Sequence, residues 1–165
     1  MARARNATAA SIQDHMITNK HLLVGITVTG ILGVALAIPL RAEVLITQQE
    51  AMLPPDTGSK QRGLTRGPSI ILVAPTTNAS VPSPFELKVK FEGHGGAKID
   101  PDSVIVTYKC IPAVDLTQRV RPYVRADGID MTAAEAPPGV HRIKVELKDT
   151  DGRVGTAEFA LTVGK

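Results

Sequence analysis

Histidine and cysteine are the side chains of this protein that could bind a transition-metal ion. The histidines are His15, His21, His94 and His141, and the one cysteine is Cys110. His15 and His21 precede a long apolar run, so only His94 and His141 are available together in the part of the chain that follows it. Imidazole nitrogens are ligands that Cu(II) accepts. These two histidines are the candidate metal ligands, although the sequence favours no metal site.

Four aspartates, Asp100, Asp102, Asp149 and Asp151, lie in two short polar segments. Their carboxylates could bind Ca²⁺ if the two segments met, since this ion prefers oxygen ligands. Asp side chains also bond to the backbone in turns, and Gly152 directly follows the second pair. We therefore interpret these aspartates as turn and corner residues.

Catalytic motifs are missing from the sequence. It contains no G-x-S-x-G, no H-E-x-x-H and no second cysteine. The segment GHGG at 93–96 is not followed by Lys-Ser or Lys-Thr, so it predicts a loop between strands rather than a phosphate-binding loop. We expect a protein that is not an enzyme and that holds no cofactor.

A cluster of arginine and tyrosine is the best candidate for a surface that binds another protein. It consists of Arg119, Arg121, Tyr123 and Arg125. Arg and Tyr are enriched among the residues that dominate binding energy at protein interfaces. The competing interpretation is an ordinary solvated loop.

Composition limits the other classes of ligand. Apolar residues make up 43% and charged residues 21%, which is typical of a globular protein. Aromatic residues are only 3%, without tryptophan, so stacking surfaces for sugars or other small molecules are not expected. Residues 38–165 contain 16 basic and 15 acidic side chains. This balance argues against nucleic-acid binding, which depends on neutralising phosphates.

The run Leu22–Leu40 is uncharged over 19 residues. As a helix it would span roughly 28 Å, close to the hydrocarbon core of a bilayer. It also contains an A-x-A site, Ala35 to Ala37, which is typical of a cleaved signal peptide. Both roles stay open. In either case the basic residues of the leader, 1–21, predict that it stays in the cytoplasm and that the rest is exported.

The exported part is predicted to have two regions. Residues 41–67 are expected to form a stalk and flexible linker, because 54–68 (PPDTGSKQRGLTRGP) is rich in Pro, Gly and polar residues. Residues 68–165 show short alternating runs broken by turn residues, the pattern of an all-β antiparallel sandwich. The predicted strands include 69–74, 85–91, 104–110, 141–148 and 159–163, with a tight turn at 149–152 (DTDG).

The region 111–130 interrupts this alternation. Asp115 and Gln118 have the spacing of a capping box, which predicts one helical turn that ends before Pro122. Gly128 then begins the next extended run. Just before this region, Cys110 shares a predicted strand face with Tyr108. We expect a buried free thiol there, because one cysteine cannot close an internal disulfide.

The second half resembles a known group of domains. PPG at 137–139 followed by alternation, D-T-D-G at 149–152, a final F-x-L-x-V and the segment IDPDSVIVTY at 99–108 resemble bacterial extracytoplasmic immunoglobulin-like domains, including cadherin-like modules. The resemblance implies about seven strands, and a role in binding or assembly rather than catalysis. Many such domains have a corner tyrosine two residues after the glycine, where this chain has His141.

A second resemblance, to small periplasmic copper carriers, is the main alternative. That family also ends in PPG, alternation, Asp-Gly and an apolar strand. It uses a histidine at the mature N-terminus and another just after the Asp-Gly. This chain has Arg153 at the latter place and no histidine near 38–43. A guanidinium is no copper ligand, so the departure weakens this alternative.

The sequence thus predicts a non-catalytic binding or accessory module with an immunoglobulin-like sandwich, preceded by one hydrophobic helix. We expect it on the outer side of the cytoplasmic membrane, anchored by residues 22–40 or released after cleavage. Its partner is expected to be a protein at or near that membrane, contacted through the loop 111–130 and the sheet edges.

Overall fold

The computed structural model describes residues 42–58, 66–77 and 79–165. The predicted leader and the apolar run Leu22–Leu40 lie outside these residues. Within them, no helix is long and apolar enough to cross a membrane.

The described residues form ten strands and three short helices. In chain order these are β1 (Glu43–Val44), α1 (Gln48–Ala51), β2 (Ser69–Ala74), β3 (Ser80–Val81), β4 (Phe85–Glu92), β5 (Ile99–Tyr108), β6 (Val114–Asp115), α2 (Thr117–Val120), the 3₁₀ helix η1 (Arg121–Tyr123), β7 (Val124–Arg125), β8 (Gly128–Glu135), β9 (Gly139–Asp149) and β10 (Val154–Val163).

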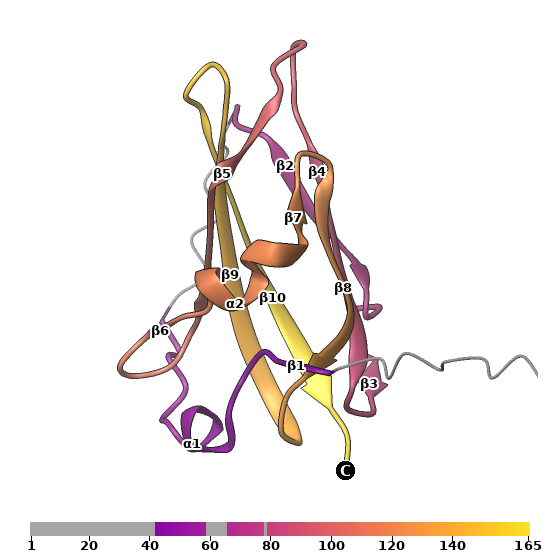
Figure 1. Cartoon of the computed structure of the whole chain (residues 1–165). Coiled ribbons are helices and arrows are strands. Elements are labelled where there is room, and N and C mark those ends of the chain that lie inside the picture. The colour runs from indigo at the N-terminus through magenta and orange to yellow at the C-terminus, as the bar shows by residue number, and fades with distance from the viewer. Residues whose placement is uncertain (1–41, 59–65, 78) are drawn as a thin grey trace, which may run out of the picture. The chain divides into compact units, whose positions relative to one another are not determined.

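The strands form two sheets that pack face to face (Figure 1). In the first sheet, β4 lies between β2 and β8, and both β1 and β7 pair with the other side of β8. The second sheet has the order β3-β10-β9-β5-β6. The predicted all-β sandwich is therefore confirmed.

Two details of the predicted sandwich differ. The sequence predicted about seven strands, all antiparallel, whereas β1–β8 and β3–β10 are parallel pairs. These extra strands are only two residues long, so they leave no periodic signal in the sequence. They run parallel because they reach a sheet edge from loops rather than through a hairpin.

The long strands alternate as predicted. In β4 every second side chain from Phe85 to Phe91 is buried, and the charged residues between them are exposed. In β9 the same rule buries His141, Ile143, Val145 and Leu147. Because successive side chains of a strand point to opposite faces, each sheet presents one apolar face to the other. This aliphatic layer is the core of the domain.

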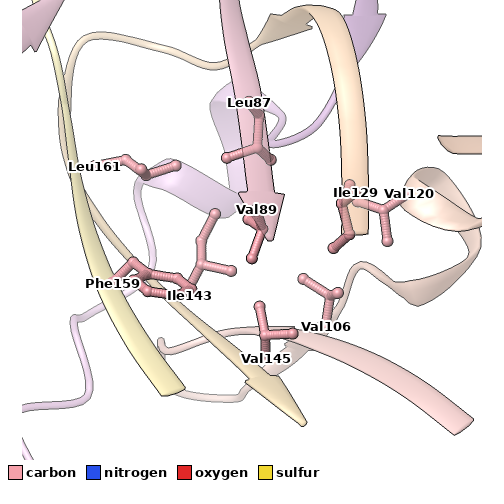
Figure 2. A pocket seen from close by; sticks show the side chains of 9 residues that line it. All are labelled: Leu87, Val89, Val106, Val120, Ile129, Ile143, Val145, Phe159 and Leu161. Atoms are coloured by element: carbon pink, nitrogen blue, oxygen red, sulfur yellow. The ribbon is translucent and has the colours of Figure 1, made fainter. Parts of the chain in front are cut away.

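A small cavity remains where the two sheets meet (Figure 2). Its volume is about 10 Å³, at the lower limit for a single water molecule. The side chains around it are all apolar: Leu87, Val89, Val106, Val120, Ile129, Ile143, Val145, Phe159 and Leu161. The cavity is therefore a packing gap rather than a ligand site.

Residues 43–56, which we call the N-terminal arm, belong to the sandwich and do not form the predicted stalk. Leu45 and Ile46 are 0% and 1% exposed and lie in the main core cluster. Between them and Pro55, α1 begins with a capping box in which Thr47 and Glu50 bond to each other's backbone. Pro55 then forms a bridge with Cys110. The apolar pair and the capped turn are what attach this segment.

Two local boundaries also differ from the sequence prediction. The strand expected at 104–110 begins earlier, at Ile99, and ends at Tyr108. The helical turn after Asp115 exists, but its N-cap residue is Leu116, without a side-chain bond. Asp115 instead accepts a hydrogen bond from the Thr117 amide at 2.8 Å. The expected capping box is therefore an Asx turn that leads into α2.

Burial of the N-terminal arm predicts a large loss of stability when its apolar pair is truncated. Leu45→Ala or Ile46→Ala should each lower the free energy of unfolding of the full chain by about 2–5 kcal/mol. Val44→Ala is the matched control, because the neighbouring Val44 is exposed and its loss should change stability by less than about 0.5 kcal/mol. Urea unfolding followed by circular dichroism measures all three. Equal behaviour of Leu45→Ala and Val44→Ala would show that the arm is not part of the folded unit.

Candidate functional site

The segment that carries the predicted arginine and tyrosine cluster is fixed firmly to the second sheet. Leu116 and Val120 are fully buried. The Thr117 hydroxyl accepts a hydrogen bond from the backbone amide of Val106, at 3.0 Å. Because β5 thus holds α2 by both packing and hydrogen bonding, the exposed residues that follow α2 are presented on a rigid support.

Arg119 points into the domain rather than toward a partner. Its guanidinium donates two hydrogen bonds of 2.7 Å to the two carboxylate oxygens of Glu50, and one of 2.9 Å to the carbonyl of Leu45. Charge-assisted, bidentate hydrogen bonds of this kind are about twice as strong as hydrogen bonds between neutral groups. The Arg119 hydrogen bonds lower the pKa of Glu50 from its usual 4.5 to about 2. Arg119 therefore joins the N-terminal arm to α2.

The other three residues of the cluster remain at the surface, and we call them the η1 surface: Arg121, Tyr123 and Arg125. The Arg121 side chain is 44% exposed and donates a hydrogen bond of 2.9 Å to the Asp102 carboxylate. Tyr123 is half-buried and packs against the core cluster. Arg125 is exposed in β7. The structure thus keeps three of the four predicted residues on one short accessible segment.

His141 is buried and both of its ring nitrogens are engaged. Nε2 lies 2.7 Å from the carbonyl oxygen of Pro137, which can only accept, so Nε2 carries the proton. Nδ1 then accepts a hydrogen bond from the Tyr108 hydroxyl, at 3.2 Å. The imidazole therefore takes the place of the corner tyrosine, and neither nitrogen has a lone pair free for a metal.

His94 lies far from His141. Its Nε2 is 2.8 Å from the Ser69 hydroxyl, and its carbonyl accepts a hydrogen bond from Arg153. Arg153 in turn pairs with Asp149, at the end of β9 opposite to His141. Eight residues of strand separate those two positions, or ~26 Å. The two histidines therefore lie at opposite ends of the sandwich, and the described residues contain no group of three or more His, Cys, Asp or Glu side chains that could hold a metal ion.

Two of the four aspartates, Asp149 and Asp100, hold turns as the sequence indicated, whereas Asp102 and Asp151 form ion pairs with Arg121 and Arg153. Asp149 accepts hydrogen bonds from the backbone amides of Asp151 and Arg153 and from the Arg153 side chain. Burial would raise the pKa of Asp149, but the bonds from Arg153 outweigh this and lower it. Asp100 accepts from the amide of Asp102.

Cys110 is the buried free thiol that the sequence predicted. Its sulfur lies 3.2 Å from the carbonyl oxygen of Pro112. Burial raises the pKa of the Cys110 thiol. Because the thiolate is the reactive form, burial of this thiol and its raised pKa disfavour reaction at Cys110.

Comparisons with known proteins do not assign this chain to a family. No protein-family model matches the chain, and no match was found among curated proteins. One solved structure is similar, CopC from Methylosinus trichosporium OB3b. It is 18% identical over 58% of this chain and 94% of its own, with a TM-score of 0.39. A TM-score this low supports neither a shared fold nor a shared function.

Two ion pairs of the N-terminal arm were not predicted from the sequence. Glu50 binds Arg119, and Asp56 forms an ion pair with Lys109. The partners are far apart in sequence, so spacing gives no signal for either pair. A local signal does exist for α1, since Thr47 and Glu50 have the S/T-x-x-E spacing of a capping box.

The lowered pKa of Glu50 predicts a specific pH dependence of stability. A carboxylate whose pKa is lower in the folded state stabilises the fold above its unfolded pKa, and this contribution is lost as the pH falls through the folded value. Glu50→Gln should therefore cost about 1–2 kcal/mol at pH 7, allowing for partial exposure of the pair. The difference from the unaltered chain should shrink between pH 4.5 and about 2.

Glu92→Gln is the matched control, because Glu92 forms an exposed ion pair with Lys90. Such surface pairs contribute little, so this variant should unfold like the unaltered chain. Urea unfolding at a series of pH values measures the effect. A Glu50→Gln difference that does not depend on pH would show that the ion pair is not its source.

The positions of the histidines predict the result of a copper titration. His94 and His141 cannot bind one ion together, since they lie at opposite ends of the domain. We expect no sub-micromolar binding of Cu(II) or Cu(I) by isothermal titration calorimetry. Tight binding that is lost in both His94→Ala and His141→Ala would contradict this and support the copper-carrier alternative.

Proposed function

We propose that this protein is a non-catalytic binding module on the outer side of the cytoplasmic membrane, and that it contacts a protein partner through the η1 surface. The observation that carries the proposal is the presentation of Arg121, Tyr123 and Arg125 on a segment held rigidly by buried neighbours. A rigid support lowers the entropy lost on binding. Arg and Tyr are also the side chains that most often dominate binding energy at interfaces.

The exposed ion pair of Arg121 is compatible with binding to a protein partner. The Asp102 carboxylate that pairs with Arg121 is itself exposed, with 83% of its side chain accessible to water. An exposed pair of this kind contributes little to folding. Arg121 can therefore exchange Asp102 for an acidic group of a partner without a large loss of stability.

The location rests on the amino-acid sequence. The basic leader followed by the uncharged run Leu22–Leu40 directs the rest of the chain to the outer side, whether the run is kept or cleaved. We also infer that the sandwich is of the immunoglobulin type. The orders β2-β4-β8-β7 and β10-β9-β5 correspond to the ABED and GFC sheets of that fold. Such domains commonly serve binding and assembly.

Co-purification tests this proposal. The tagged full chain would be isolated from detergent-solubilised membranes of its own host, and the bound proteins identified by mass spectrometry. Arg121→Glu with Arg125→Glu should lower the yield of a specific partner by about tenfold or more.

Lys88→Glu with Lys90→Glu is the matched control. These lysines are about as exposed as Arg121, at 47% and 58%, but lie on the outer face of the first sheet. The proposal fails if the chain always elutes alone, or if the control pair lowers the yield as much as the arginine pair.

A further inference from the structure

Most edges of the two sheets are too short or too well covered to pair with another strand. In the second sheet the outermost strands β3 and β6 have two residues each. Beyond β6 the free side of β5 is covered, because the Leu116 amide donates to the Val106 carbonyl at 2.8 Å and Arg121 donates to the Asp102 carbonyl at 3.3 Å. In the first sheet, β1 and β7 are two-residue strands along β8. Such edges do not attract other chains.

Strand β2 is different. It ends the first sheet beside β4 (Figure 1), and its six residues, Ser69–Ala74 (SIILVA), include no charge and no proline. Its outward-facing side chains Ile71 and Val73 are 43% and 48% exposed, whereas the outward-facing side chains of β4 are all charged. An uncharged edge strand with exposed apolar side chains favours pairing with another strand.

Strand register shows which backbone groups of β2 point away from its own sheet. Phe91 lies opposite Ile70, and its amide donates to the Asp127 carbonyl at 2.9 Å, on the far side of β4. Opposite residues of an antiparallel pair either bond to each other or both point away. The amide and carbonyl of Ile70 therefore point to the open edge, and so do those of Leu72. Among the described residues these groups have no backbone partner.

The open backbone groups are complementary to an extended strand, and a second copy of β2 supplies one. In an antiparallel pair with its twofold axis at Ile71, Ile70 of one copy lies opposite Leu72 of the other. The two residues can then exchange all of their free amide and carbonyl groups. The contact is closed, because each copy uses the same edge.

The side chains are compatible with this register. Ile71 faces itself across the axis, and Ser69 faces Val73. A charged residue on the axis would face its own like charge, which is unfavourable, whereas β2 has isoleucine there. The nearest basic residue before the strand, Arg66, falls opposite Thr76. The edge is therefore electrostatically suited to a second copy of itself.

We propose that two copies of this protein pair through β2, antiparallel about Ile71, so that their first sheets join into one continuous sheet. The flat part of the edge is short, since Pro68 packs against Gly155 and a register shift follows Leu72. A contact of this size gives a reversible dimer that depends on concentration. The dimer goes beyond the proposed function, because it presents two η1 surfaces and so raises the avidity for a partner with two matching sites.

Disulfide crosslinking of the purified full chain in detergent tests the dimer. The two Ile71 residues would form a pair without mutual backbone hydrogen bonds, with Cα atoms about 4.5 Å apart, which is within reach of a disulfide. Ile71→Cys is therefore the reporter. Ile105→Cys is the matched control, because Ile105 is an isoleucine of similar exposure, 50%, on the outer face of the second sheet. The unaltered chain measures the background from the buried Cys110.

We expect Ile71→Cys to form a crosslinked dimer on mild oxidation, at a rate about tenfold or more above that of Ile105→Cys, because pairing raises the effective concentration of the second thiol. Gel electrophoresis without reductant measures the dimer, and circular dichroism checks that both variants fold alike.

A second crosslink tests the register without a cysteine on the axis. A mixture of Ser69→Cys chains and Val73→Cys chains should form a mixed dimer. Adding Ile71→Lys to both chains should lower its yield by about fivefold or more, because two like charges then face each other. Adding Ile105→Lys instead should leave the yield unchanged.

Three results would overturn the proposal: equal crosslinking of Ile71→Cys and Ile105→Cys, a Ser69–Val73 crosslink that persists with Ile71→Lys, or absence of both crosslinks. A disulfide from Ile71→Cys to a different protein, when host membranes are oxidised before solubilisation, would assign the edge to that protein instead. Partner co-purification through Arg121 and Arg125 is measured separately, so failure of the dimer leaves the proposed function intact.

Discussion

The Arg119 guanidinium joins the N-terminal arm to the rest of this domain through three hydrogen bonds. It holds the Glu50 carboxylate through two hydrogen bonds and the Leu45 carbonyl through a third, while its backbone belongs to α2. One side chain therefore joins the N-terminal arm, the second sheet and the segment that carries the η1 surface. Because both charges are partly shielded from water, the pair is stronger than an ordinary surface ion pair.

In the core, aliphatic side chains fill most of the space between the two sheets, and aromatic side chains contribute little. The two facing sheets contribute mainly valine, leucine and isoleucine, and the buried aromatic side chains are Phe85, Phe91 and Tyr108. The gap between packed sheets is about 10 Å, which two layers of aliphatic side chains can fill. The small cavity in Figure 2 is a gap in the packing of this aliphatic layer. His141 and Tyr108 supply a polar tie at the edge of this layer, and every buried side-chain nitrogen and oxygen in the described residues has a hydrogen-bond partner.

The long strands were predictable because their signal is local. The alternation in β4, β9 and β10 and the Asp-Gly turn at 149–152 follow from side-chain direction along a strand and from the positive φ of 75° at Gly152. The two-residue strands β1, β3, β6 and β7 were missed because two residues carry no period. The N-terminal arm was mistaken for a stalk because Leu45 and Ile46 follow an apolar run and precede a Pro-rich segment. Their burial depends on β8, far along the chain.

The sequence indicated which residues form the candidate site, but it did not show which of their side chains point into the domain and which point outward. Spacing alone could not distinguish Arg119, which points inward, from Arg121 and Arg125, since the acidic partner of Arg119 is supplied by a distant segment. Likewise, strand parity indicated that His141 faces the core. It could not show that Tyr108 and Pro137 occupy both ring nitrogens.

The parallel pairing of β1 with β8 has a consequence for the order of events during folding. The arm is made before β8, so Glu43 can pair only after Ala134 has been made. Contacts between such distant parts of a chain close late, because the loop between them must first lose its freedom. The earliest residues of this domain are thus among the last to settle, because the apolar pair Leu45 and Ile46 lacks its partner strand until β8 has been made.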